Sequence, residues 1–204
     1  LYNSEEEARG DAENFKNYVK KDTDEVIGES ITVTLQPQIS FVLMDQATGE
    51  VKAISGGRGA KTANLTLNRA TNVPRQPGST FKVVAAYAAA LDSAGMTLAT
   101  TQYDAPYNYN GGKGRPVRNW NGENYQGWTS LRRGIEQSMN IVAVKTITDI
   151  TPALGINYLK NMGITTMQEE LKNGKNDYTQ AMVLGGITNG VKNVELTAAY
   201  ATIA

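Results

Sequence analysis

Nine consecutive apolar residues, Val83 to Leu91, place the strongest constraint on how this sequence can fold. They follow the rigid loop Pro74 to Gly78, and together the two segments predict a helix from Ser79 to Ala94. A helix that is apolar on every side is normally buried, so we expect the other elements to pack around it. The run is too short to span a bilayer, which takes about 20 apolar residues.

Apolar periodicity and turn residues predict the other elements. Two strands, 39–45 and 50–55, should form a hairpin around the turn at 46–49. Residues 101–128 have no period and are expected to form an irregular loop. Further helices are expected over 5–22, over 129–137 with Thr129 as N-cap, and over 141–150, 152–162 and 193–204.

Composition excludes several classes of protein. The 204 residues suit one domain or a piece of a larger one, and 40% hydrophobic residues allow a sizeable core. Twenty basic residues balance twenty acidic ones, so no excess of positive charge indicates a nucleic acid or an anionic lipid as partner. The acidic, polar first residues do not resemble a signal peptide.

The sequence contains neither cysteine nor histidine. Thiol catalysis, thiolate metal sites and disulfides are therefore excluded, as are Ser-His-Asp triads and histidine zinc sites. We expect no metal and no cofactor. An enzyme of this composition needs Lys, Asp, Glu, Tyr or water as its base. The absence of cysteine fits an extracytoplasmic protein.

Ser79 and Lys82 form a Ser-x-x-Lys at the start of the predicted buried helix. Three residues are nearly one helical turn, so both side chains can lie on one face. Burial lowers the pKa of a lysine, which would let a neutral Lys82 accept the Ser79 proton. Chance alone supplies about one such pattern in a chain of this length. Its position between a loop and a buried helix favours the catalytic interpretation.

Ser138 and Asn140 form a Ser-x-Asn at a break between two predicted helices. Such residues are most often helix caps, which is the alternative interpretation. If they enter a cleft beside Lys82, the serine can relay a proton and the asparagine can fix the lysine and a substrate amide.

Taken together, these motifs resemble the penicillin-binding proteins, in particular the transpeptidase domain of the bifunctional class A type. The resemblance extends from about Pro37 to Ala204. It rests on RQPGSTFK (Arg75–Lys82), SMN (Ser138–Asn140) and three longer stretches, MDQATGEVKAISGGRG (Met44–Gly59), LNRAT (Leu67–Thr71) and VLGGITNGVKNVELTAAYATIA (Val183–Ala204).

The resemblance implies a serine acyltransferase that cross-links peptidoglycan stem peptides. Ser79 would attack the penultimate D-alanine carbonyl, with Lys82 as its base. Ser138 would pass the proton to the leaving amine, and Asn140 would order the site. β-Lactam antibiotics would acylate the same serine. The parent protein would lie on the extracytoplasmic face of the bacterial membrane, held by a segment absent here.

The sequence departs from the family pattern in one respect, because it contains no Lys-Thr-Gly or Lys-Ser-Gly. The family carries this third motif on a strand after the last predicted helix, so we expect it in a missing remainder of the domain, possibly a second chain. The implied fold is the α/β (α+β) penicillin-recognising type with an incomplete sheet. Residues 1–36 would form an N-terminal helix and linker, and 37–204 the transpeptidase portion.

Six large aromatic residues lie in the predicted loop: Tyr103, Tyr107, Tyr109, Trp120, Tyr125 and Trp128. A carbohydrate platform is one interpretation and ordinary loop packing the favoured one, with Asn119 and Trp120 expected to contact substrate at the cleft edge. Two alternative functions stay open. A β-lactamase of class A would need a Glu-x-x-Leu-Asn stretch, which does not occur here, and an inactive β-lactam sensor could share the fold.

Overall fold

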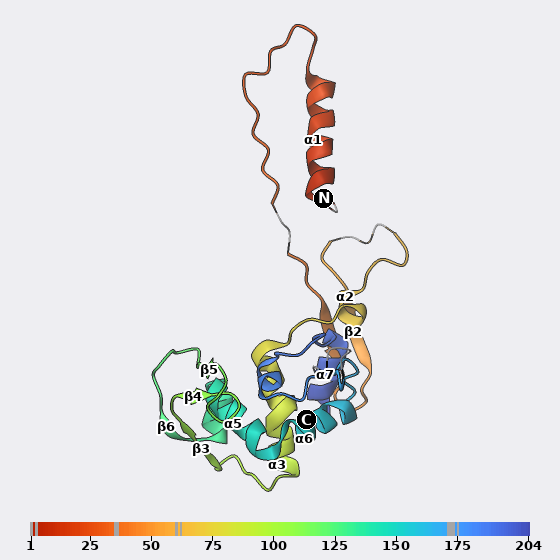
Figure 1. The fold of residues 1–204 in the computed structure, drawn as a ribbon. Helices are drawn as coiled ribbons and strands as arrows, with labels where there is room; N and C mark the ends of the chain where they lie inside the picture. The colour runs from red at the N-terminus through yellow and green to blue at the C-terminus, as the bar shows by residue number, and fades with distance from the viewer. Residues whose placement is uncertain are drawn as a thin grey trace. The chain divides into compact units, whose positions relative to one another are not determined.

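The computed structural model describes residues 2, 4–34, 37–59, 61, 63–170, 174 and 176–204. The chain divides into two compact units, Leu1–Gln38 and Ile39–Ala204, which are described separately. The first unit consists of helix α1 (Glu5–Val19) and the segment that follows it (Figure 1). Ser4 caps this helix, since its Oγ accepts a hydrogen bond from the Glu7 N–H at 3.1 Å.

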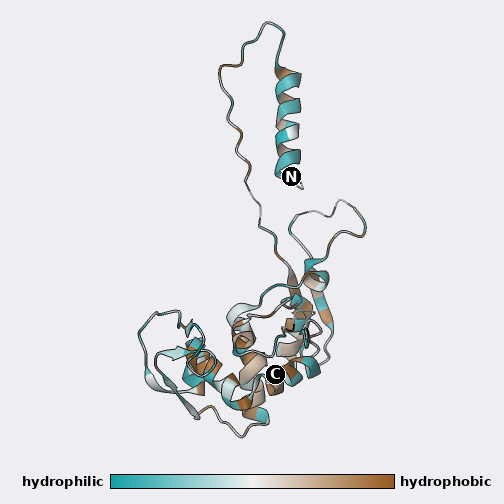
Figure 2. Ribbon diagram, in the orientation of Figure 1, coloured by the Kyte–Doolittle hydropathy of each residue, from teal (hydrophilic) through white to brown (hydrophobic). Residues whose placement is uncertain are grey.

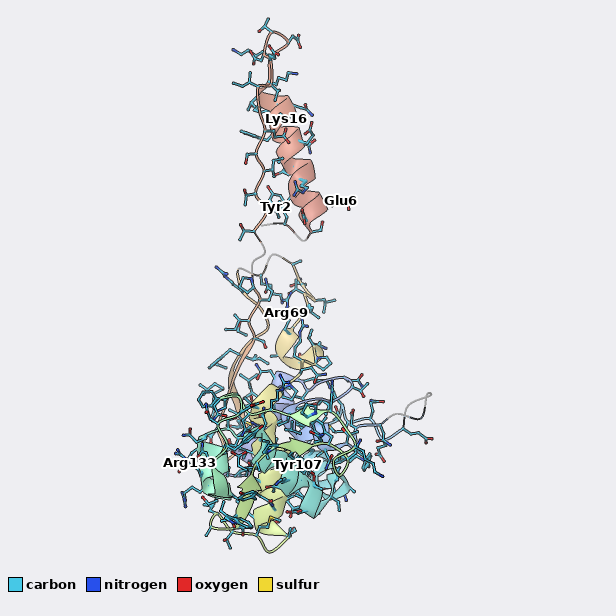
Figure 3. All side chains as sticks on the ribbon, turned by 60° about the vertical axis from the view of Figure 1, so that its left-hand side comes forward. Tyr2, Glu6, Lys16, Arg69, Tyr107 and Arg133 are labelled. Carbon is cyan, nitrogen blue, oxygen red and sulfur yellow. The ribbon has the colours of Figure 1, made fainter. Side chains whose placement is uncertain are left out.

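Helix α1 buries none of its residues and is stabilised locally. Three glutamates occupy its first turn, where negative charge is favoured. Figure 3 labels Lys16, which lies in the last turn of the helix. Lys16 forms ion pairs with Glu13 at 2.5 Å and with Glu29 at 2.9 Å. Exposed pairs of this kind contribute little to stability, because water screens them.

The second unit contains the predicted catalytic residues and a single buried core. Its elements are β1 (Phe41–Met44), β2 (Val51–Ser55), α2 (Arg69–Asn72), η1 (Gly78–Thr80), η2 (Val83–Tyr87), α3 (Ala88–Asp92), β3 (Thr101–Asp104), β4 (Tyr107–Asn108), β5 (Pro116–Val117), β6 (Gly127–Ser130), α4 (Leu131–Glu136), α5 (Asn140–Ile150), α6 (Pro152–Asn161), η3 (Gln180–Leu184) and α7 (Asn193–Ala201).

The predicted hairpin is confirmed. Strands β1 and β2 pair antiparallel with Phe41 opposite Ser55, and a shift in register separates Leu43 from Met44. Helix α7 packs against β1, where Asn193 Nδ2 donates to both Ser40 O at 3.2 Å and Ser40 Oγ at 3.1 Å. Apolar side chains of the hairpin remain exposed, among them Phe41 (54%) and Leu43 (51%).

The predicted central helix is buried as expected, but it is not a regular α-helix. Its first turn, η1, is a tight 3₁₀ turn, and η2 is π-helical, with the Ala88 N–H donating to Val83 O five residues back. The α-helical part, α3, ends at Asp92, two residues short of the prediction. The predicted helix is thus confirmed, but its mixed character was not predicted, because side chains that are apolar on every face carry no period from which the number of residues per turn can be inferred.

Helices α5, α6 and η3 pack around this central segment. Figure 2 shows hydrophobic residues gathered in these helices. The largest buried side chains are Tyr87, Phe81, Leu131, Met139, Ile141, Ile147, Ile156, Leu159, Met182, Val84, Val142 and Val144.

Two predictions for the segment before α4 were wrong. Residues 101–128 are not wholly irregular, because β3 pairs antiparallel with β6 and β4 with β5. Thr129 is not the N-cap of α4, because it is paired within β6. The cap is Ser130, whose Oγ accepts from the Arg133 N–H at 3.2 Å. Both errors arise from pairing between residues distant in sequence, which local periodicity does not record.

Helices α5, α6 and α7 confirm three predicted helices to within a few residues at each end. In α6, Gly155 lies against the central segment, and a Cβ there would be 2.4 Å from Ala85 O and 2.7 Å from Met182 Cε. The absence of a side chain at Gly155 therefore allows α6 to approach the helix that begins at the predicted nucleophile.

We predict that Gly155→Ala destabilises the second unit by about 1–3 kcal/mol through overpacking. Alanine has the better helix propensity, so the backbone effect alone would stabilise the variant. A loss of stability therefore indicates the steric effect. Thermal unfolding followed by circular dichroism measures it. Gly10→Ala in α1 is the control, because nothing lies within 4 Å of its added Cβ. An unchanged or raised melting temperature for Gly155→Ala would contradict the packing described.

Candidate active site

The loop before Ser79 is held by the segment that precedes α7. Arg75 forms an isolated antiparallel bridge with Val191, with N···O distances of 2.9 and 2.8 Å. The Gln76 side-chain amide contacts the main chain of Ile187, donating to its carbonyl and accepting from its N–H at 3.4 Å. The Gln76 contacts join residues 111 positions apart, so a segment distant in sequence supports the loop.

Ser79 lies in the 3₁₀ turn η1 and is exposed. Gly78 before it has φ +57°, and the backbone of Gly185 approaches so closely that a Cβ there would be 2.4 Å from Gly78 N. Behind the serine, the Tyr200 hydroxyl of α7 donates to Thr80 O at 2.6 Å. The turn is therefore held by contacts with Gly185 and Tyr200, while Ser79 itself is exposed.

Lys82 is buried, with a 2% exposed fraction. Its Nζ donates to Ser138 O at 2.6 Å, to Ser138 Oγ at 3.0 Å and to Asn140 Oδ1 at 2.6 Å. The structure thus brings together three of the four predicted catalytic residues from segments 56 to 58 positions apart.

None of these three acceptors carries a formal charge. Burial therefore lowers the pKa of Lys82 from its ordinary value of 10.5 to about 8, because no carboxylate compensates the ammonium for the loss of water. A substantial fraction of the side chain is then neutral near pH 8 and able to accept a proton.

The Ser138 backbone adopts φ +48°, an uncommon conformation for a residue other than glycine. Its N–H donates to Ile135 O at 3.0 Å, and the Met139 N–H donates to Gly134 O at 2.9 Å. These bonds end α4 and turn the chain so that both the carbonyl and the hydroxyl of Ser138 reach Lys82. Backbone strain of this kind clusters at functional sites.

Asn140 is the first residue of α5, and the two residues that follow β5, Arg118 and Asn119, fix it. Its Nδ2 donates to Arg118 O at 2.7 Å, which leaves its Oδ1 for Lys82. Its main-chain N–H donates to Asn119 Oδ1 at 2.9 Å, as the Ile141 N–H does at 3.1 Å. The role of Arg118 was not predicted from the sequence, because every residue has a main-chain carbonyl and the residue type does not indicate this contact.

No hydrogen bond between Ser79 Oγ and Lys82 Nζ is found among the described residues. The expected hydrogen bonds of Lys82 with Ser138 and Asn140 are present. Catalytic hydrogen bonds are often long before substrate binds, so this geometry does not remove Lys82 as a base.

The two residues expected at the cleft edge differ in their surroundings. Asn119 is 5% exposed, and its amide is engaged by α5 and by Asp104. Trp120 is 71% exposed, and its Nε1–H donates to Gln137 O at 2.8 Å, next to Ser138. Contact of either residue with substrate remains a prediction.

The exposed aromatic residues of β3 and β6 form a separate group. The Tyr103 and Trp128 rings are 5.2 Å apart and tilted by 59°, and Lys145 Nζ lies 5.2 Å from the centre of the Tyr107 ring. Within the described part of the chain, no three acidic side chains gather into a metal site, and no helix is long and apolar enough to cross a membrane.

Comparison with known proteins decides the family. Residues 39–204 match the family described as "Penicillin binding protein transpeptidase domain". The chain belongs to this family. The transpeptidase match begins at the residue where the second compact unit begins, and it contains Ser79, Lys82, Ser138 and Asn140.

Relatives named penicillin-binding protein 1A support the assignment. The protein of Clostridium botulinum is 34% identical over 173 residues, which cover 81% of this chain and 20% of the relative. Penicillin-binding protein 1A/1B of Bacillus subtilis is 29% identical over 198 residues, covering 93% and 20%. This transpeptidase chain therefore spans about a fifth of the length of those relatives.

A solved structure confirms the fold. The crystal structure of penicillin-binding protein 1A from Haemophilus influenzae superposes with a TM-score of 0.64 at 28% identity, covering 81% of this chain and 23% of that one. The predicted mixed helix and strand fold with an incomplete sheet is thus confirmed.

We predict that the Lys82 Cε resonance in NMR spectra titrates with a midpoint near pH 8. Asn140→Asp would place a carboxylate against the amine and raise this midpoint, because an opposite charge stabilises the ammonium. Asn140→Ala, which adds no charge, is the control for the lost hydrogen bond. Lys82→Arg identifies the resonance by its disappearance. A midpoint near the ordinary 10.5 in the unaltered chain would show that burial does not favour the neutral amine.

Proposed function

We propose that this domain is a serine D,D-transpeptidase that cross-links peptidoglycan stem peptides. The observation that carries the proposal is the buried Lys82 amine held against Ser138 and Asn140, one turn after an exposed serine. A buried lysine with a lowered pKa is an expected base for a serine in a chain without histidine.

In the first half of the reaction, neutral Lys82 takes the Ser79 hydroxyl proton as Oγ attacks the penultimate D-alanine carbonyl. The main-chain N–H of Ser79 supplies one donor for the oxyanion. Collapse of the tetrahedral intermediate breaks the peptide bond, and the terminal D-alanine leaves. Its nitrogen receives the proton from Lys82 through the Ser138 hydroxyl, which lies 3.0 Å from Nζ.

In the second half, an amine of a neighbouring stem peptide attacks the acyl-enzyme. Lys82 and Ser138 remove its proton, and Ser79 leaves as the free hydroxyl. Asn140 holds Lys82 throughout through its Oδ1, because its Nδ2 is committed to Arg118 O. The cycle uses no redox step and no cofactor.

We further propose β-lactam antibiotics as covalent ligands of Ser79, because their strained amide presents the same carbonyl to the same nucleophile. Because peptidoglycan is cross-linked outside the cell membrane, this substrate would place the whole protein on the extracytoplasmic face. Nucleic acid is not proposed as a partner, given the balanced charge of the chain.

The exposed hairpin supports one more part of the proposal. Phe41, Leu43, Val51 and Ile54 are 43–54% exposed on a two-stranded sheet, and an isolated pair of strands is marginally stable. We propose that further strands of the transpeptidase domain in the whole protein cover this hairpin, and that one of them carries the third motif, Lys-Thr-Gly or Lys-Ser-Gly. It would bind the substrate carboxylate and supply the second oxyanion donor.

The test is covalent labelling with a fluorescent penicillin, using the full-length natural protein that contains these 204 residues. Ser79→Ala should abolish the label. Lys82→Ala should slow acylation by about a hundredfold or more while the melting temperature stays within a few degrees, since general base catalysis is worth that much. Ser93→Ala, at the far end of the same helical segment, is the matched serine control and should label normally.

The persistence of the label separates the alternatives. A transpeptidase retains it for long periods, a β-lactamase releases it with turnover, and an inactive sensor never takes it up. Labelling of Ser79→Ala at the unaltered rate would identify a different nucleophile.

A further inference from the structure

A chain of buried and partly buried hydrogen bonds leads from Lys82 through Asn140 and Asn119 to Asp104 at the end of β3. Asp104 is 1% exposed and accepts from Asn119 Nδ2 at 2.8 Å and from the Gln126 N–H at 2.9 Å. No ion pair of Asp104 is found among the described residues. A buried carboxylate without a cation is costly, so its two donors must hold it well.

The hydrogen-bond pattern fixes the orientation of the Asn119 amide. Its Oδ1 faces two main-chain N–H groups, those of Asn140 and Ile141, so this atom must be an acceptor. Its Nδ2 faces the Asp104 carboxylate and must be a donor. An amide at 119 opposite a carboxylate at 104 satisfies every partner, whereas two amides or two carboxylates do not.

Asn119 connects this pair to the reacting groups. With Arg118 it holds Asn140 by both its main-chain N–H and its side-chain Nδ2. The remaining Asn140 atom, Oδ1, lies 2.6 Å from Lys82 Nζ. A rotation of the Asn119 amide would release the first turn of α5, and Asn140 would no longer be fixed against Lys82.

We propose that Asp104 and Asn119 are a positioning pair that sets Asn140 against Lys82 and thereby sets the rate at which Ser79 is acylated. This inference rests on the proposed transpeptidase function. Neither residue touches the reacting atoms, so both act through Asn140. A displacement of about 1 Å in a catalytic group can cost up to a hundredfold in rate, so the effect is measurable.

The two residues permit an exchange of amide and carboxylate that keeps their shape. In Asn119→Asp, the carboxylates at positions 104 and 119 face each other. Asp104→Asn replaces one of the two accepting oxygens by an NH₂ group. That group then faces another donor, either Asn119 Nδ2 or the Gln126 N–H. The double variant Asp104→Asn/Asn119→Asp restores a complementary pair, because the new amide at position 104 can donate to the carboxylate at position 119 and accept from the Gln126 N–H.

The experiment measures penicillin acylation per folded molecule, in the full-length protein and well below each melting temperature. We expect each single variant to slow acylation by about tenfold or more and the double variant to recover most of the loss. Thr146→Ala is the stability control. It removes a buried hydroxyl bonded to Val142 O in the same helix, without touching the pair. It should lower the melting temperature and leave acylation unchanged.

The outcomes separate this inference from the proposed function. Single variants that acylate at the unaltered rate per folded molecule would overturn the positioning role, whatever their stability. If the unaltered protein is not acylated at all, the proposed function is wrong. The Lys82 Cε resonance then decides the positioning role. The chemical shift of this resonance should change in both single variants and return to its original value in the double variant. An unchanged resonance in all three variants would overturn the inference.

Discussion

The site depends on one buried amine, Lys82, and the three uncharged oxygens that it contacts. The central helical segment places this amine in the core, and the turn between α4 and α5 supplies the oxygens. Because none of those oxygens is a carboxylate, burial shifts the amine toward its neutral form instead of fixing it as an ammonium. A carboxylate in the position of Asn140 would favour the charged form, and the amine could then no longer accept a proton.

The rest of the second unit keeps the two sides of this contact in place. On the serine side, Arg75 and Gln76 are bonded to Val191 and Ile187, and Thr80 is bonded to Tyr200. On the other side, the chain from Asp104 through Asn119 holds the start of α5. The Ser79 turn and the Ser138–Asn140 segment are thus supported by different long-range contacts, and the hydrogen bonds of Lys82 reach from one to the other.

Much of the fold follows from local sequence. Alternation and a four-residue turn indicated the β1–β2 hairpin, and Thr151 with Pro152 indicated the start of α6. The mixed 3₁₀, π and α character of the central segment could not be predicted, because no polar residue marks a face between Val83 and Leu91. The pairing of β3 with β6 was missed for another reason, since it joins residues about 25 positions apart.

The candidate site likewise contains residues that the sequence predicted and residues that it did not. Ser79, Lys82, Ser138 and Asn140 were predicted as site residues because their chemistry and spacing are distinctive, and the structure brings the last three together. Asn119 was noticed only as an edge residue, and neither Asp104 nor the Arg118 carbonyl was noticed. Their importance lies in which atoms they face after folding, and a carboxylate at the end of a strand carries no such information in the sequence.

The most direct test is a crystal structure of the benzylpenicillin acyl-enzyme of the full-length protein. It should show a covalent bond from Ser79 Oγ to the opened lactam carbonyl. Lys82 Nζ should lie within hydrogen-bond distance of that Oγ while keeping its contacts to Ser138 and Asn140. An acyl group on any other side chain, or a Lys82 amine turned away from Oγ in the acylated state, would contradict the account.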